Sequence, residues 1–426
     1  MTDGLKINRV VDHLFRHESG KLVAVLTRIF GPGNLDLAED VVQDALVEAL
    51  NKWTYQGIPA NPQGWLYKVA RNKAINVLNR EKYKRAYETE ASRWLQSVGT
   101  EGPASDLLFS ETEVLDDQLR MMFICCHPTL KVDSQIALML KTLCGFSIRE
   151  IAKAFLTTEE NIHKRLVRAR LKIRESKLSF ELPVGHALEN RLPTVLAAIY
   201  LLFNEGYNAS AGADLIRYEV CEEAIRLVEL LVSDAVLKEQ PDVFALLALM
   251  QLNACRFNAR VDQEGNLVTL EQQDRGRWDL PLMKTGLANL QRAVANQEFS
   301  AYHILALISS CHCCAPDYHS TNWKNILGLY DMLTRLDDSP LVLLNRAIAV
   351  GKVHGAGEAA AELERLNEVP ALKVYHLFHS VKADVCMELE QYATAGELLQ
   401  TAIDLAPLPA ERAFLERKLA ACKKKF

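Results

Sequence analysis

Hydrophobic residues follow helical spacing through most of this chain, and alternating strand patterns are scarce. Over residues 37–50, apolar pairs recur every four positions, which predicts one buried face of a helix with Asp36 as its N-cap. A turn-rich loop over residues 54–64 leads into a second predicted helix, from Trp65 to Leu78. The pattern predicts an all-α protein, with a first module over residues 7–85.

A second module, over residues 114–177, ends in two helices joined by a tight turn. The first begins at Ser147, and Glu150 follows three residues later, which is the spacing of a capping box. The second helix begins at Thr158, and its apolar residues repeat at helical spacing: Ile162, Leu166, Ala169 and Ile173. A short helix, a tight turn and a basic second helix predict a helix-turn-helix, whose second helix enters the major groove of DNA.

Residues 178–426 also follow a helical pattern and are rich in Ala and Leu. Breaks between helices are predicted near Gly206, Pro241, Gly265, Pro281, Pro316, Pro340 and Pro370. Five residues near the C-terminus match the second half of a tetratricopeptide repeat: Tyr392, Ala395, Leu399, Ala402 and Pro407. In that repeat, small residues let two helices approach and the proline ends the pair. Earlier segments match less well, so the repeats are degenerate or the array is short.

The composition is that of a globular chain, with 49% hydrophobic and 24% charged residues, and it excludes a disordered protein. No apolar run reaches the ~18 residues of a membrane span, and the N-terminus lacks the basic-then-apolar pattern of a secretory signal. Ten cysteines without such a signal indicate reduced thiols. We therefore expect a cytoplasmic protein with no membrane partner.

The net charge of −5, from 49 Lys and Arg against 54 Asp and Glu, conceals opposite local charges. Residues 64–85 and residues 141–177 each carry a net +6, whereas residues 86–118 between them carry −7. The tail, residues 178–426, carries −9. Two basic segments on separate helical modules indicate binding to phosphates, and the acidic stretch over residues 86–113 is predicted to be a flexible linker.

Polar residues on the first module define two candidate faces. The face opposite the apolar pairs of residues 37–50 is mostly acidic, and it is either solvated surface or a docking face for a basic partner helix. On the helix that begins at Trp65, four polar residues recur at intervals of three and four on the side expected to be exposed: Lys68, Arg71, Asn72 and Asn76. Cations there can hold a phosphate backbone, and amides can bond base edges that are free only in separated strands. Such a face suits single-stranded DNA.

The basic helix of the second module carries the candidates for reading duplex DNA. Side chains near its start would contact base edges and the later arginines would hold phosphates. The candidates are Thr158, Glu159, Asn161, His163, Lys164, Arg165 and Arg168. Glu159 and Glu160 interact favourably with the dipole at the start of the helix, but they would repel phosphates. The base groups that these carboxylates could recognise are the amino groups of cytosine.

Three motifs, in order and at family spacing, resemble the extracytoplasmic-function sigma factors of the sigma-70 family. They are Ala38–Asp44, Trp65–Asn72, and Gly145–Ala152 with Arg165–Arg170. The family consists of two helical domains joined by a linker. The resemblance implies a bacterial sigma factor that binds core RNA polymerase, recognises promoter DNA and initiates transcription.

The resemblance also implies a role for each motif. The first docks on a coiled coil of the largest polymerase subunit in that family, and it matches Asp40, Gln43 and Asp44 here. The second melts and captures the −10 promoter element, and it matches Lys68, Arg71, Asn72 and Asn76, with the 54–64 loop as a base pocket. The helix-turn-helix matches the reader of the duplex −35 element. The acidic linker is expected to thread a basic channel of the polymerase.

The tail resembles one sigma-factor subgroup that has a C-terminal tetratricopeptide-like extension. The resembling stretches are Phe203–Ser210, Glu271–Asp279, Leu344–Val350 and Glu411–Leu419, together with Cys125–Pro128. The resemblance implies a helical domain over residues 185–285 and a solenoid-like helical domain over residues 286–426. Such an extension is expected to control activity through a protein partner or an intramolecular contact. Its concave face is the expected partner surface, with contributions from Asp274, Arg275 and Trp278.

No enzymatic, metal or cofactor chemistry is predicted. The chain has no phosphate-binding GxxxxGK[ST] loop and no GxSxG nucleophile motif. The clusters at Cys311–Cys314 and Cys125–His127 place ligands next to each other, which rarely fits one zinc tetrahedron. Redox sensing through Cys311, Cys313 or Cys314 stays open.

Two alternatives to a sigma factor remain at this point. A helix-turn-helix regulator could bind duplex operators without polymerase, but it needs neither the acidic face at Asp40, Gln43 and Asp44 nor a separate basic helix at 65–85. A scaffold protein dominated by its C-terminal repeats would leave both basic segments unexplained.

Overall fold

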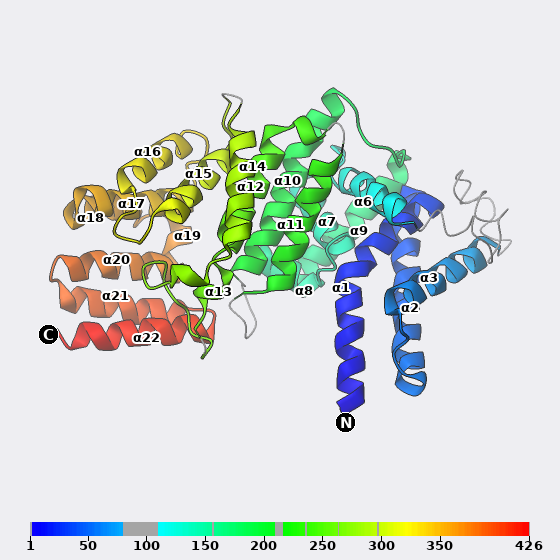
Figure 1. Ribbon diagram of the computed structural model, residues 1–426, viewed down its shortest axis with the longest axis horizontal. Helices are drawn as coiled ribbons and strands as arrows, with labels where there is room; N and C mark the ends of the chain where they lie inside the picture. The colour runs from blue at the N-terminus through cyan, green and yellow to red at the C-terminus, as the bar shows by residue number, and fades with distance from the viewer. Residues whose placement is uncertain are drawn as a thin grey trace. The chain divides into compact units, whose positions relative to one another are not determined.

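A computed structural model describes residues 2–79, 110–155, 157–208, 216–234, 237–262, 264–295 and 298–425. The chain divides into two compact units, Met1–Leu202 and Phe203–Phe426, which are described separately (Figure 1). Both are built from helices. The described residues contain one isolated bridge, between Val261 and Leu267, and no strand, so the all-α prediction is confirmed.

The N-terminal unit contains seven α-helices and a 3₁₀ turn among its described residues, and an eighth helix crosses into the second unit. In chain order they are α1 (Thr2–Phe30), η1 (Pro32–Asn34), α2 (Leu35–Gln56), α3 (Pro62–Asn79), α6 (Glu111–Cys125), α7 (Val132–Thr142), α8 (Ile148–Ala154), α9 (Glu159–Ser176) and α10 (His186–Tyr207). The predicted linker falls mostly on residues 80–109, which lie outside the described residues, and its last three residues belong to α6.

Helices α1, α2 and α3 pack together around the apolar face predicted for residues 37–50. Trp53 is 2% exposed, and its ring meets the half-buried Trp65 of α3 edge-on, with 5.3 Å between ring centroids. The predicted N-cap is wrong: α2 begins at Leu35 after Asn34, so Asp36 lies inside the first turn. Its carboxylate is therefore available for a partner other than its own helix end.

The predicted helix-turn-helix is present as α8 and α9. Ser147 and Glu150 form the reciprocal bonds of a capping box, because the Ser147 N–H donates to Glu150 Oε2 at 2.8 Å and the Glu150 N–H donates to Ser147 Oγ at 3.2 Å. Thr158 caps α9 by accepting from the Asn161 N–H at 3.3 Å. The predicted inward residues of α9 are its buried residues: Ile162, Leu166, Ala169 and Ile173.

The described part of the C-terminal unit is a succession of helices. They are α11 (Tyr218–Ser233), η3 (Leu237–Glu239), α12 (Pro241–Ala254), α13 (Phe257–Arg260), η4 (Arg275–Arg277), α14 (Leu280–Ala293), α15 (Ala301–Cys314), α16 (Trp323–Leu333), α17 (Pro340–His354), α18 (Ala356–Arg365), α19 (Pro370–Lys373), α20 (His376–Glu388), α21 (Tyr392–Leu405) and α22 (Pro409–Lys423). Four of the predicted prolines lie in the first turn of a helix, where their missing N–H costs nothing: Pro241, Pro281, Pro340 and Pro370.

Helix α12 is the centre of this unit. Residues Val243 to Leu252 are buried without interruption, so the helix is enclosed on all sides, and α11, α14 and α15 pack on it. Its one buried amide, Gln251, accepts a hydrogen bond from Asn289 of α14 at 2.8 Å. From α15 onward, consecutive helices pack in sequence, and α20, α21 and α22 lie side by side (Figure 1). This nearest-neighbour stacking is the arrangement of helical-repeat proteins.

The small residues predicted to let two helices approach do so in α21. Ala395, Leu399 and Ala402 are each 0% exposed and share a core with Leu415 and Leu419 of α22. Helix α21 ends at Leu405, two residues before Pro407. The repeat-like interpretation of this segment therefore agrees with its packing.

Candidate nucleic-acid and polymerase interface

The acidic face of α2 is exposed in the N-terminal unit. Asp40, Gln43 and Asp44 are separated by three and four residues and all three side chains are exposed. Val47, which is 54% exposed, continues the same face. Neither Asp40 nor Asp44 forms an ion pair with another described residue. This face therefore combines free carboxylates with an exposed apolar residue, as a surface for a basic partner would.

Two further carboxylates of the same helix are engaged by the second module. Arg170 of α9 contacts Asp36 Oδ1 through Nε at 3.1 Å and Glu39 Oε2 through Nη2 at 2.7 Å. Arg174 contacts Asp36 Oδ2 at 2.8 Å and also donates to the Gly33 carbonyl at 3.1 Å. Thr142, at the end of α7, donates its hydroxyl to Glu39 at 3.2 Å. In this arrangement, the last two turns of the basic helix are held against α2.

This contact changes the interpretation of the later arginines of α9. The sequence pattern placed them on phosphates, but Arg170 is only 14% exposed and its charge is met by two carboxylates. The exposed basic side chains of the helix are Lys164, Arg168, Lys172 and Arg174, and Arg174 pairs with Asp36. His163 is exposed beside Lys164. The exposed basic surface of α9 therefore extends from Lys164 to Lys172 and leaves out Arg170.

The start of α9 presents its polar residues outward. Thr158, Glu159, Glu160 and Asn161 are exposed, and Lys164 pairs with Glu160 at 2.7 Å. Arg165 differs, because it is half-buried, lies 3.6 Å from Asp133 and stacks over the Phe155 ring at 5.2 Å. Six of the seven predicted reading positions are thus exposed, whereas Arg165 is half-buried and also holds α9 against its neighbours.

Helix α3 exposes only part of its predicted polar face. Lys68 and Asn76 are exposed and Asn72 is half-buried. Arg71 is 9% exposed, so its predicted exposure is wrong: it lies on the side of α3 that packs into the unit. The loop before α3 is also shorter than the pattern suggested, because α2 continues to Gln56 and α3 begins at Pro62.

Glu18 of α1 positions the start of α3, and the sequence pattern did not single it out. Its buried carboxylate accepts from Gln63 Nε2 and from the Tyr67 hydroxyl, each at 3.0 Å, and pairs with Lys21 at 2.9 Å. These contacts fix the first turn of α3 against α1. A single carboxylate in a polar stretch of α1 gives no periodic signal, so only the packing identifies it.

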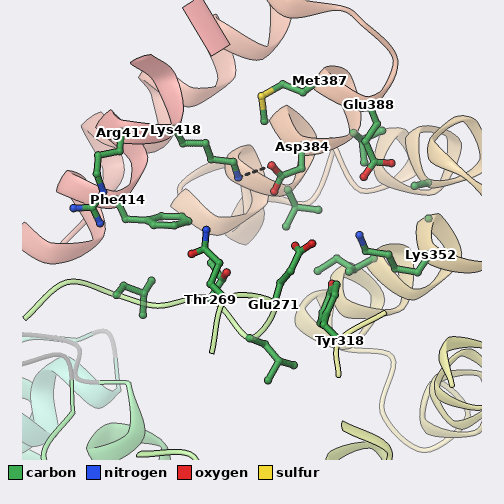
Figure 2. A pocket seen from close by; sticks show the side chains of 18 of the residues that line it. Thr269, Glu271, Tyr318, Lys352, Asp384, Met387, Glu388, Phe414, Arg417 and Lys418 are labelled. Carbon is green, nitrogen blue, oxygen red and sulfur yellow. Dashed lines mark ion pairs between the residues drawn. The ribbon is translucent and has the colours of Figure 1, made fainter. Parts of the chain in front are cut away.

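The C-terminal unit contains a groove of about 920 Å³ between the loop before α14 and the helices α17, α20 and α22 (Figure 2). One side carries the cations of α22, Arg417 and Lys418, and the other carries Lys352 of α17. Figure 2 shows Glu271 and Tyr318 directed into the space between them and Lys418 paired with Asp384. Neither Glu271 nor Glu388 forms an ion pair with another described residue.

The pKa of Tyr318 reflects the negative charges that line this groove. Burial is the largest cause that raises the pKa of its hydroxyl to about 12, and the carboxylates Glu271, Asp384 and Glu388 contribute in the same direction. Three carboxylates thus act on one phenol from the loop and from α20. The groove is therefore lined by separated charges of both signs over an apolar floor that includes Ile348, Val385 and Phe414.

The residues expected to form the partner surface have other contacts. Trp278 is 5% exposed. Arg275 donates to the carbonyls of His312 and Ala315 at 2.7 and 2.8 Å, and Asp274 caps the 3₁₀ turn through the Gly276 N–H at 2.9 Å. Together they anchor the loop before α14, whose preceding residues Glu271 and Gln272 line the groove. The expected motif is thus adjacent to the groove and supports its wall.

Across the described ranges, no three His, Cys, Asp or Glu side chains gather in a way that could hold a metal ion. The ten cysteines are free thiols, and Cys125 and Cys126 are buried in the N-terminal unit. None of the described helices is long and apolar enough to cross a membrane.

Comparisons with known proteins agree with this arrangement of modules. The family described as "Sigma-70 region 2" matches residues 14–83, and "Sigma-70, region 4" matches residues 120–173. A family of unknown function, DUF6596, matches residues 191–294. The first two matches coincide with the module of α1 to α3 and with the helix-turn-helix module.

Two relatives carry the comparison further. An uncharacterized protein of Rhizobium meliloti (strain 1021) is 35% identical over 395 residues, which cover 91% of this chain and 90% of the relative. A Haemophilus influenzae protein named "Probable RNA polymerase sigma factor" is 27% identical over 147 residues, which cover 32% of this chain and 75% of that protein. No solved structure matches the chain.

The fold and the matched regions define a two-module initiation factor joined to a long helical extension. The chain belongs to the sigma-70 family of RNA polymerase sigma factors, as an extracytoplasmic-function type with a C-terminal extension.

Proposed function

We propose that this chain brings core RNA polymerase to promoters whose −35 and −10 elements it reads with α9 and α3, and that its C-terminal extension controls this activity. The observation that supports the proposal best is the coexistence, in one unit, of an exposed acidic face on α2 and an exposed polar start of α9. A regulator that binds operators by itself needs only the second of these. Binding to core polymerase places the activity in the bacterial cytoplasm.

Each surface has a separate task in this proposal. Asp40, Gln43 and Asp44 meet a basic segment of the core polymerase. Lys68 and Asn76 contact the separated strands at the −10 element, where free base edges accept amide hydrogen bonds. The duplex −35 element is read by the exposed polar residues of α9: Thr158, Glu159, Asn161, His163, Lys164 and Arg168.

Run-off transcription with purified core polymerase tests the proposal. Templates carrying the region upstream of the gene for this protein are expected to give a defined transcript only when the full-length chain is added. The double substitution Asp40→Ala with Gln43→Ala is expected to weaken core binding by about tenfold, close to 1.4 kcal/mol, because it removes one charge and one amide from the exposed face. Binding is measured by fluorescence anisotropy of the labelled protein.

The control for this substitution is Glu175→Ala, which removes an exposed carboxylate from the last turn of α9, on a different helix from the acidic face. It is expected to leave core affinity within about twofold. If no start site depends on the added chain, the proposal is wrong. If the α2 variant and the control bind core equally well, the assignment of the acidic face is wrong.

The groove of the C-terminal unit is the part of the extension that we propose takes a protein partner. Its separated positive and negative side chains and its apolar floor fit a peptide segment of mixed charge. A charge reversal, Glu388→Lys, is expected to change the transcript yield at least threefold in cell extract while core affinity stays unchanged. The matched control is Glu397→Lys on the exposed face of α21, outside the groove. Equal yields for both variants would exclude the groove as the control site.

A further inference from the structure

Two cysteines of the C-terminal unit lie next to each other in its interior. Cys255 follows the last residue of α12 and Cys313 lies in the last turn of α15, and their Sγ atoms are 3.9 Å apart. Cys255 is 0% exposed and Cys313 is 6% exposed. The Leu252 carbonyl lies 3.1 Å from the first sulfur and 3.5 Å from the second. An approach of about 2 Å would bring the sulfurs to the length of a disulfide bond.

Two arginines that form no ion pair among the described residues act on this pair. Arg256 donates to the Tyr207 hydroxyl at 2.9 Å and to Asn253 Oδ1 at 2.6 Å. Arg275 donates to two backbone carbonyls. Neither guanidinium forms an ion pair with a carboxylate of the described residues, and Arg256 Nε and Arg275 Nη2 are buried without a hydrogen-bond partner there.

A thiolate would supply the missing negative charge. Arg256 and Arg275 are half-buried, so water screens their charges incompletely, and a thiolate is the form of cysteine that reacts with oxidants. The hydrogen bond from Cys255 lowers the pKa of the Cys313 thiol, and Arg256 and Arg275 lower it further against the effect of burial. The same hydrogen bond and burial raise the pKa of Cys255. The two thiols therefore have different roles: Cys313 is the nucleophile and Cys255 keeps its proton.

We propose that Cys255 and Cys313 form a redox-active dithiol that hydrogen peroxide converts to a disulfide. The Cys313 thiolate attacks one peroxide oxygen, the O–O bond breaks, and the leaving hydroxide takes a proton and departs as water, which leaves a sulfenic acid on Cys313. Cys255 Sγ then attacks the sulfenic sulfur, the S–O bond breaks, and a second water leaves with the Cys255 proton. Two thiols lose two electrons in total, and one peroxide is reduced to two waters.

The position of the pair connects it to the groove. The Asp279 N–H donates to the Cys255 carbonyl at 2.8 Å, and Arg275 binds the His312 carbonyl next to Cys313. The loop that supplies Glu271 and Gln272 to the groove is therefore tied to both helix ends that carry the cysteines. A disulfide would join these two ends covalently. This inference concerns the C-terminal unit alone and does not depend on the proposed role in transcription.

Thiol mapping of the full-length protein tests the proposal. The reduced protein is treated with a small excess of hydrogen peroxide, quenched with catalase, denatured in N-ethylmaleimide and digested for mass spectrometry. We expect a peptide cross-linked through Cys255 and Cys313, the loss of two alkylated thiols of the ten in the chain, and recovery of both with dithiothreitol. Oxidation confined to Cys311 or Cys314, with Cys255 and Cys313 alkylated as before treatment, would overturn the proposal.

Single substitutions separate the two roles. Cys255→Ser is expected to leave a sulfenic acid on Cys313 that dimedone traps, whereas Cys313→Ser is expected to give no adduct on Cys255. The control is Cys314→Ser, which removes the exposed thiol of the same helix end and should leave the cross-link yield unchanged. A dimedone adduct on Cys255 in the Cys313→Ser variant would contradict the assigned order of reaction. The thiol mapping of the wild-type chain tests the proposal even if one of these variants does not fold.

Discussion

Replacing Arg170 by Ala is expected to lower the free energy of unfolding of the N-terminal unit by about 2–4 kcal/mol. Arg170 is 14% exposed and Glu39 is 18% exposed, so water screens their ion pair poorly. Without the guanidinium, Glu39 keeps the hydrogen bond from the Thr142 hydroxyl but loses the charge that its carboxylate pairs with. The contact with Asp36 contributes less, because that carboxylate is 48% exposed. Urea denaturation, together with hydrogen exchange of peptides from α2 and α9, measures the loss.

Arg168→Ala is the matched control, since Arg168 lies on the exposed side of the same helix two residues earlier. It is expected to change the free energy of unfolding by less than about 0.5 kcal/mol. A double-mutant cycle with Glu39→Gln should give a coupling energy above about 1 kcal/mol for the pair. Equal effects of Arg170→Ala and Arg168→Ala would show that the contact between α9 and α2 is not formed in solution.

Replacing Gly20 by Ala is expected to destabilise the same unit by about 3 kcal/mol. A Cβ atom at this position would lie 2.0 Å from the carbonyl oxygen of Leu143 and 2.9 Å from its Cα atom. These are backbone atoms, so no side chain can rotate away, and α1 has to separate from the end of α7. Helix propensity alone predicts the opposite sign, a gain of about 1 kcal/mol for Ala in place of Gly inside a helix. Thermal and urea denaturation therefore distinguish the two effects by sign.

The control for this prediction is Gly328→Ala in α16. A Cβ atom there would meet nothing within 4 Å, so only helix propensity acts and a gain of about 0.5–1 kcal/mol is expected. The contact between α1 and the end of α7 would be disproved if Gly20→Ala were as stabilising as Gly328→Ala.

The amphipathic helices were predictable because one periodic face is enough to define each of them. The apolar pairs of residues 37–50 and the inward residues of α9 are buried as their spacing predicts. The capping box at Ser147 and Glu150 was also predictable, since all its bonds lie within four residues. Local rules succeed where both partners of an interaction are close in the sequence.

The errors arose where a distant segment decides the environment of a side chain. Arg71 has the spacing of an exposed residue but lies on the packed side of α3. Arg170 belongs to a basic stretch typical of phosphate contacts, yet its partners are Asp36 and Glu39, more than a hundred residues away. No periodicity within α9 or α3 carries that information. Glu18 and the residues of the groove escaped detection for the same reason.

The sequence by itself determined the all-α class, the helix-turn-helix, the order of the modules and the resemblance to sigma factors, because these depend on hydrophobic spacing, capping and local charge. Only the tertiary structure decided which charges are free. It pairs the end of α9 with α2, leaves Asp40 and Asp44 exposed, and brings Cys255 and Cys313 together beside two arginines that form no ion pair within the described part of the chain. The physical reason is that burial and counter-charge are properties of the space around a side chain, and residues far apart in the chain fill that space.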